Sequence, residues 1–168
     1  MHTKNKSSCS CVQLLTFCTH QHQMTLGQIH ERNGKHIWQP TPLGEAVAAA
    51  LETLRYTESV FLISDYVVMP NHVHMLIMSQ RANDKTTLWF AAQCKHTLSK
   101  RMLRVRPAKD PFWEPSFERQ YLQQEHTQYA MSQCIREHHR LWNYDSLNHT
   151  LTARPSTPAQ TTSWPPLP

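Results

Sequence analysis

Two histidines separated by one residue form the sharpest chemical feature of the sequence. His72 and His74 flank Val73 at the start of an apolar run, directly after the pair Pro70-Asn71. If this run is a strand, alternate side chains point to the same face, with their Cα atoms about 7 Å apart. The two imidazoles can then converge on one metal ion while Val73 points to the opposite, buried face. The His-x-His pattern alone also permits two exposed or internally hydrogen-bonded histidines.

The elements that must position this pair follow from composition and turn signals. Asn33-Gly34 marks the turn of a hairpin, and Thr41 with Pro42 marks a helix start, Thr41 being the N-cap. Strands are expected at 12–19, 60–69, 72–78 and 117–122, and helices at 43–55, 88–104 and 127–141, with Thr127 as the candidate cap of the last. Strands interleaved with three helices predict an α+β fold, an antiparallel sheet with helices packed on one face.

Composition is consistent with one folded domain that carries positive charge. The 168 residues have a formal net charge of +5 and include 12 histidines. A basic surface favours polyanions such as nucleic acid, although a soluble basic protein without such a partner has the same charge. We expect a frayed N-terminus at 1–11, a folded domain at 12–149 and a disordered tail rich in Pro, Ser and Thr at 150–168.

Localisation is inferred from what the sequence lacks. No stretch is apolar enough for a membrane-spanning helix, and the N-terminal apolar run is too short for a signal peptide. The five cysteines are odd in number and irregular in spacing, which favours free thiols in a reducing compartment. The sequence therefore predicts a cytoplasmic protein without a membrane partner.

The segment around the histidine pair closely resembles a known signature. Residues 66–74, YVVMPNHVH, resemble the signature of the HUH single-tyrosine transposases, most of all the branch associated with repetitive extragenic palindromes (REP). Further segments resemble this family in the same order, namely 15–20 (LTFCTH), 41–47 (TPLGEAV), 93–100 (QCKHTLSK) and 112–117 (FWEPSF). Together they cover roughly residues 12–148.

The resemblance implies a fold, a metal and a reaction. It implies a ferredoxin-like (RRM-like) fold whose open sheet face holds the active site. In this family the two histidines and a polar residue from the last helix bind Mg²⁺ or Mn²⁺, and a helix tyrosine attacks the scissile phosphate to give a covalent 5′-phosphoryl link. The implied partner is DNA of a palindromic element, a hairpin with single-stranded flanks. No nucleotide cofactor is implied, and both a monomer and a homodimer remain open.

The last helix departs from the family pattern. On the best matching register, Cys134 stands at the position of the nucleophilic tyrosine and His138 at that of the third metal ligand. Positions four apart share a helix face, as the chemistry requires. A third imidazole would shift metal preference from Mg²⁺ toward Mn²⁺, Zn²⁺ or Ni²⁺. Tyr129 is the alternative nucleophile, and a buried structural thiol is the alternative for Cys134.

Positive charge on the helix after the His-x-His strand supplies candidate DNA contacts. These are Lys95, Lys100, Arg101 and Arg104, although a solvated helix face would look the same. The first hypothesis is a metal-dependent transposase that cleaves and transfers DNA strands. The second is a catalytically inactive descendant that binds the same DNA without the tyrosine. The third is an unrelated basic binding protein with a fortuitous His-x-His.

Overall fold

The computed structural model describes residues 11–57, 60–80 and 83–148. Most of the expected frayed N-terminus and the whole expected tail at 150–168 lie outside the described residues. Cys11 was expected in the frayed segment, but it is the first residue of strand β1. The described part of the chain therefore starts with a strand residue, one position before the predicted domain boundary.

A four-stranded antiparallel sheet forms the centre of the molecule. In spatial order its strands are β4 (Leu62–Val68), β5 (His72–Ser79), β1 (Cys11–Cys18) and β6 (Glu118–Leu122). All three pairings are antiparallel. Numbered along the chain without the separate β2–β3 hairpin, the sheet strands lie in the order 2-3-1-4, with a helix after the first and the third. This is the β-α-β-β-α-β arrangement of a ferredoxin-like fold, so the predicted fold class is confirmed.

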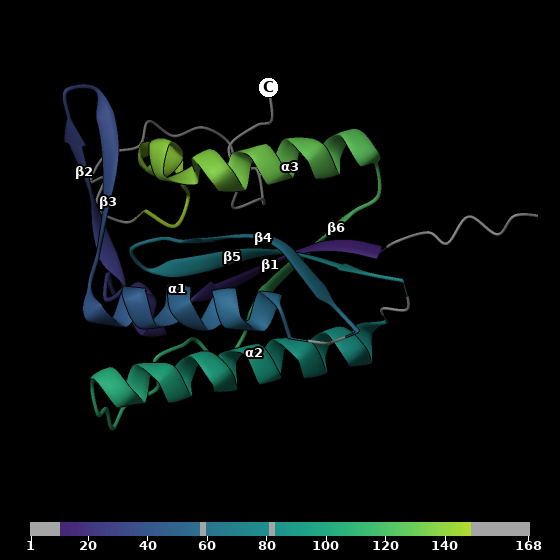
Figure 1. Ribbon diagram of the computed structural model, residues 1–168, viewed down its shortest axis with the longest axis horizontal. Helices are drawn as coiled ribbons and strands as arrows, with labels where there is room; N and C mark the ends of the chain where they lie inside the picture. Colours follow the sequence, from purple (N-terminus) through teal and green to yellow (C-terminus); the bar gives the residue numbers. More distant parts are fainter. Residues whose placement is uncertain (1–10, 58–59, 81–82, 149–168) are drawn as a thin grey trace, which may run out of the picture.

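Helices cover both faces of this sheet. Helices α1 (Pro42–Arg55) and α2 (Asp84–Val105) pack on one face, as predicted, while α3 (Glu125–Glu137) and the 3₁₀ helix η2 (His138–Tyr144) lie over the other (Figure 1). The cause is that β1 and β5 are buried on both faces, which requires a cover on each side. One hydrophobic cluster joins β5 to α1 and α2, and a second joins β1, β5 and α3. Within the described ranges no helix combines the length and apolar character needed to cross a bilayer.

The predicted hairpin and the start of α1 are confirmed in detail. Strands β2 (Gly27–Arg32) and β3 (Lys35–Pro40) pair around Asn33 and Gly34, whose φ angles are +54° and +71°. Two consecutive positive φ angles are what a type I′ turn requires, and Asn-Gly supplies them with least strain. The Thr41 side chain accepts a hydrogen bond from the Gly44 backbone N–H at 3.2 Å, so Thr41 is the N-cap.

Two helix boundaries differ from the prediction. Helix α2 begins at Asp84, four residues before the expected start at 88, because Asn83 and Thr86 form a reciprocal capping box there. Helix α3 begins at Glu125, so Thr127 lies in its first turn and is not its cap. The same helix tightens into η2 at His138, where a single α-helix to residue 141 was expected.

Candidate metal centre

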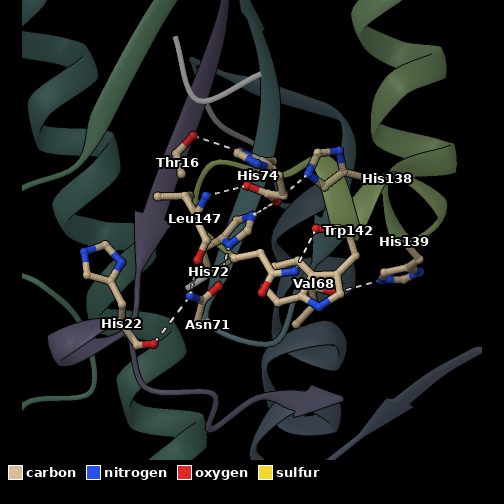
Figure 2. Close-up of polar contacts among 12 residues, drawn as sticks. Thr16, His22, Val68, Asn71, His72, His74, His138, His139, Trp142 and Leu147 are labelled. Atoms are coloured by element: carbon tan, nitrogen blue, oxygen red, sulfur yellow. Dashed lines mark hydrogen bonds and ion pairs between the residues drawn. The ribbon is translucent and has the colours of Figure 1, made fainter. Parts of the chain in front are cut away.

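Four buried side chains converge between β5 and the end of the last helix. His72 and His74 come from β5, His138 opens η2, and Asp145 follows η2 directly. One potential ligand atom from each lies within 4.8 Å of all the others, and all four residues are 0% exposed. Figure 2 shows the rings of His72, His74 and His138 facing one another. The structure thus brings together the three histidines predicted from sequence.

Strand geometry accounts for the placement of the first two histidines. His72 and His74 point to the sheet face covered by α3, whereas Val73 packs in the cluster with α1 and α2. The ring centroids of His72 and His74 are 4.5 Å apart, and that of His138 lies 4.9 Å from that of His74. The alternation of side chains along β5 therefore places the two histidines on one face and Val73 on the other, as predicted.

Asp145 was not identified from sequence. Its backbone N–H donates to the Trp142 carbonyl at 3.2 Å, and its Oδ1 accepts from the Leu147 N–H at 2.8 Å. The second bond forms an Asx turn, which leaves Oδ2 directed at the histidines. The sequence signal was present, since Asp145-Ser146 is a turn pair shortly after the predicted helix, which was expected to end at residue 141. Its separation from the histidines in the sequence does not match a metal-binding motif. Asp145 comes close to the three histidines only because η2 folds back over β5.

Two polar side chains form hydrogen bonds with the Nδ1 atoms of the strand histidines. Thr16 Oγ1 lies 2.8 Å from His74 Nδ1, and Asn71 Oδ1 lies 2.8 Å from His72 Nδ1. The Asn71 amide nitrogen donates to the Leu147 carbonyl at 2.7 Å, so its oxygen is the atom left to accept from His72. His72 therefore carries its proton on Nδ1 and presents the lone pair of Nε2 to the cluster. Outer partners of this kind set the tautomer of metal-binding histidines.

The charge state of the cluster favours a bound cation. Burial lowers the pKa of His72 and holds that of His74 well below its usual range, so both rings are neutral at pH 7. Burial alone would raise the pKa of Asp145, but the hydrogen bond from His138 and the neighbouring His72 ring hold it well below its usual range. The carboxylate is therefore ionised, with Oδ2 2.9 Å from His138 Nε2 and 3.3 Å from His72 Nε2.

The donor set fits a divalent metal ion. The His72 Nε2 lone pair and the ionised Asp145 oxygen face each other across 3.3 Å in a dry interior, an arrangement that a cation between them stabilises. Three imidazole nitrogens and one carboxylate oxygen suit Mn²⁺ or Zn²⁺ better than Mg²⁺, which prefers oxygen ligands. The buried cluster of three histidines and one aspartate could hold such an ion.

The cluster is enclosed, which differs from the open sheet face that was expected. Helix α3 and η2 lie across β5, and the Trp142 ring packs 6.2 Å from the His72 ring. Trp142 is buried in the same apolar cluster as Met131 and Ile135 of α3. Helix α3 therefore buries its apolar side against the sheet face on which the histidines lie.

The candidate nucleophiles lie in different surroundings from the histidines. Cys134 is half-buried against the apolar cluster under α3, and burial raises the pKa of its thiol. Tyr129 is 70% exposed. Of the other tyrosines, Tyr66 donates to Glu52 and Tyr121 donates to Asp84, while Tyr56 and Tyr144 are 77% and 72% exposed. A thiol on an apolar face and a phenol in solvent are both poorly placed to act beside a buried metal.

The candidate DNA contacts divide into two groups. The Lys95 side chain makes intramolecular contacts. Its ammonium donates to the Glu114 carbonyl at 2.6 Å and lies 5.3 Å from the centre of the Phe17 ring. Lys100, Arg101 and Arg104 are exposed. The sequence has no Asp or Glu from residue 85 to residue 109, so this part of α2 is a cationic surface. It lies on the opposite side of the sheet from α3 (Figure 1).

Two of the solved structures similar to this chain are described as transposases. A candidate transposase from Deinococcus radiodurans R1 matches with a TM-score of 0.51 and 19% identity, covering 82% of this chain and 97% of that one. A REP-associated tyrosine transposase bound to a REP hairpin matches with a TM-score of 0.44 and 15% identity, covering 82% of this chain and 72% of that one. No protein-family profile and no curated protein matches the chain. At this level of identity the first comparison shows a shared fold.

Proposed function

We propose that the chain is a member of the HUH single-tyrosine transposases, in their REP-associated branch, that binds hairpin or single-stranded DNA and holds one divalent metal ion. The observation that carries the proposal is the buried cluster of His72, His74, His138 and Asp145 within a transposase fold. The histidine pair alone would be weak support. The third histidine and the carboxylate, which come from a distant part of the chain, make a complete ligand set.

The residues around the cluster define the metal that we propose. Mn²⁺ or Zn²⁺ is favoured over Mg²⁺ because three of the four donors are nitrogens. A bound divalent ion supplies Lewis acidity that polarises a phosphate oxygen. The protein's own part is to orient the rings, through Asn71 on His72 and Thr16 on His74, and to exclude water by burial.

Of the two activities open to such a protein, DNA binding without strand cleavage fits the geometry better. Cleavage needs a nucleophile next to the metal, and Cys134 is a thiol whose pKa is raised by an apolar environment. Four protein ligands in a fully buried cluster resemble a closed structural site more than an open catalytic one. We therefore propose the inactive, DNA-binding descendant as the function, with cleavage as the second candidate.

A covalent trapping assay separates these candidates. The full chain is incubated with a labelled REP-like hairpin that has single-stranded flanks, in the presence of Mn²⁺, and is then denatured. We expect binding in the native gel and no labelled protein band after denaturation. An adduct that disappears in Cys134→Ala would assign cleavage to the thiol, and one that disappears in Tyr129→Phe would assign it to that phenol. Either result would overturn the non-cleaving proposal.

The cationic surface of α2 is expected to supply much of the DNA affinity. Replacing Lys100, Arg101 and Arg104 together by glutamine should weaken hairpin binding by at least tenfold at 0.1 M salt and flatten the salt dependence, since fewer counterions are released. The matched control replaces Arg32 and Lys35, exposed cations at the tip of the β2–β3 hairpin, in the same way. Equal losses in both variants would contradict a specific role for α2.

A further inference from the structure

We propose that the cavity between residues 19–25 and residues 106–112 binds one nucleotide of an unpaired DNA strand. Its phosphate would lie on Arg106 and Lys109, and its base would contact the amides of Gln21 and Gln23. The inference rests on the proposed DNA-binding function and assigns that function a second site, outside the histidine cluster.

The cavity has the size and the lining of a site for a polar ligand. Its volume is about 580 Å³, within the range of roughly 300–1,000 Å³ that is usual for small-molecule sites. Its lining includes Gln21, Gln23 and Thr25 on one side and Arg106, Lys109 and Asp110 on the other. The cations Arg106 and Lys109 outnumber the one carboxylate, Asp110, and the amide and hydroxyl groups suit a heterocycle. The volume greatly exceeds what a lone phosphate would fill.

Positively charged residues near the end of α2 precede the cavity residue Arg106 in the chain. Helix α2 ends at Val105, directly before Arg106, so its exposed cations Lys100, Arg101 and Arg104 lie within six residues of the cavity lining along the chain. The Arg106 guanidinium lies 6.0 Å from the centre of the Phe112 ring, which gives that side chain a defined position. A strand whose phosphates contact the end of α2 would therefore enter the cavity.

Backbone strain marks the opposite wall. Gln21 and His22 are consecutive non-glycine residues with φ angles of +52° and +53°. They are held there by a bond from the His22 N–H to the Thr19 carbonyl at 2.9 Å and by one from the Gln21 N–H to the Glu114 carboxylate. Such conformations persist only where surrounding contacts determine them, and they concentrate at ligand sites. Gln21, which is exposed and lines the cavity, is one of these two residues.

One residue connects the cavity wall to the histidine cluster. The Thr19 backbone N–H donates to the Asn71 carbonyl at 2.9 Å, while the Thr19 hydroxyl donates to the Gln23 carbonyl at 2.7 Å and lies 3.0 Å from the Asn71 carbonyl. The Asn71 side chain in turn accepts from His72. Figure 2 shows His22, Asn71 and His72 in this sequence along the end of the sheet. The proposed nucleotide site therefore lies next to the metal centre in the fold.

Binding of an unstructured oligonucleotide tests the proposal. The probe is a labelled, 5′-phosphorylated thymidine tetranucleotide added to the full chain in EDTA, which removes any metal contribution. Gln21→Gly suits the positive φ, so it should keep or raise the Tm while weakening the probe's Kd about fivefold. Arg106→Gln should weaken it about tenfold and flatten its salt dependence. Asn33→Gly relieves a similar φ of +54° far from the cavity and should leave the Kd unchanged.

Competition identifies which part of the nucleotide is recognised. Thymidine 5′-monophosphate should displace the probe at least tenfold better than inorganic phosphate or thymidine alone. The nucleotide site would be overturned if inorganic phosphate displaced the probe as well as the nucleotide does, if both cavity variants bound the probe with wild-type affinity, or if the wild-type chain did not bind the probe. The proposed function would still stand if hairpin binding nevertheless depended on Lys100, Arg101 and Arg104.

Discussion

Replacing His74 by alanine is expected to abolish the thermal stabilisation that Mn²⁺ or Zn²⁺ gives to the wild-type chain. A ligand that binds only the folded state at 100 times its Kd adds about 2.7 kcal/mol of stability. For a chain of 150–250 residues, each kcal/mol shifts the Tm by roughly 2–4 °C, which gives an expected rise of about 5–10 °C for the wild type. Since His74 is 0% exposed and lies at the centre of the cluster, the variant should show little or none of this rise.

The measurement compares each variant with itself. The chain is stripped with chelator and melted with and without Mn²⁺, Zn²⁺ and Mg²⁺, so the cavity that His74→Ala leaves behind cancels in the difference. His96→Ala, an exposed histidine of α2, is the matched control and should respond like the wild type. A full metal-dependent rise in His74→Ala would remove His74 from the ligand set. A larger rise with Mg²⁺ than with Mn²⁺ or Zn²⁺ would contradict the nitrogen-rich donor set.

The strand half of the site could be predicted because it depends on local geometry. Alternation along β5 places His72 and His74 on one face and Val73 on the other, whatever covers them. The same applies to the hairpin turn at Asn33-Gly34, whose backbone conformation is set by residue type. The ferredoxin-like fold was expected only from the resemblance to the transposase family, and the observed order β4-β5-β1-β6 agrees with it.

The other half of the site depends on tertiary folding, and there the sequence was less informative. The spacing of Cys134 and His138 places both on one face only if the α-helix continues, whereas α3 ends at Glu137 and η2 turns His138 inward. Asp145 accepts from His138 only after this change in helix type. Enclosure of the cluster was also unpredictable, because it results from α3 packing its apolar side on the sheet.

A substitution at Asn71 is expected to weaken the metal centre without removing a ligand. Asn71 is 0% exposed and joins three segments, since it accepts from His72, donates to the Leu147 carbonyl at 2.7 Å and donates to the His22 carbonyl at 3.4 Å. Asn71→Ala should lower metal affinity by about 10–100-fold, the usual effect of losing an outer partner. It should also lower the free energy of unfolding by roughly 2–4 kcal/mol, because buried polar groups lose their partners.

Asn71→Asp separates the effect on His72 from the effect on the C-terminal segment. The carboxylate still accepts from His72 Nδ1–H, but it has no N–H to offer to the carbonyls of Leu147 and His22. Metal affinity should therefore fall less than in Asn71→Ala, although the free energy of unfolding without metal falls at least as far. Calorimetric titration measures the first quantity and urea unfolding in EDTA the second.

The control for this pair is Asn83→Ala, which removes the side-chain cap of α2 far from the cluster. It should cost about 1 kcal/mol of stability and leave the metal Kd unchanged. If metal affinity fell equally in Asn71→Ala and Asn71→Asp, the orientation of His72 by a hydrogen bond would not matter. Asn71 would then act only through packing, and the tautomer of His72 would have to be set by Asp145. A ¹⁵N spectrum showing His72 protonated on Nε2 would establish that alternative.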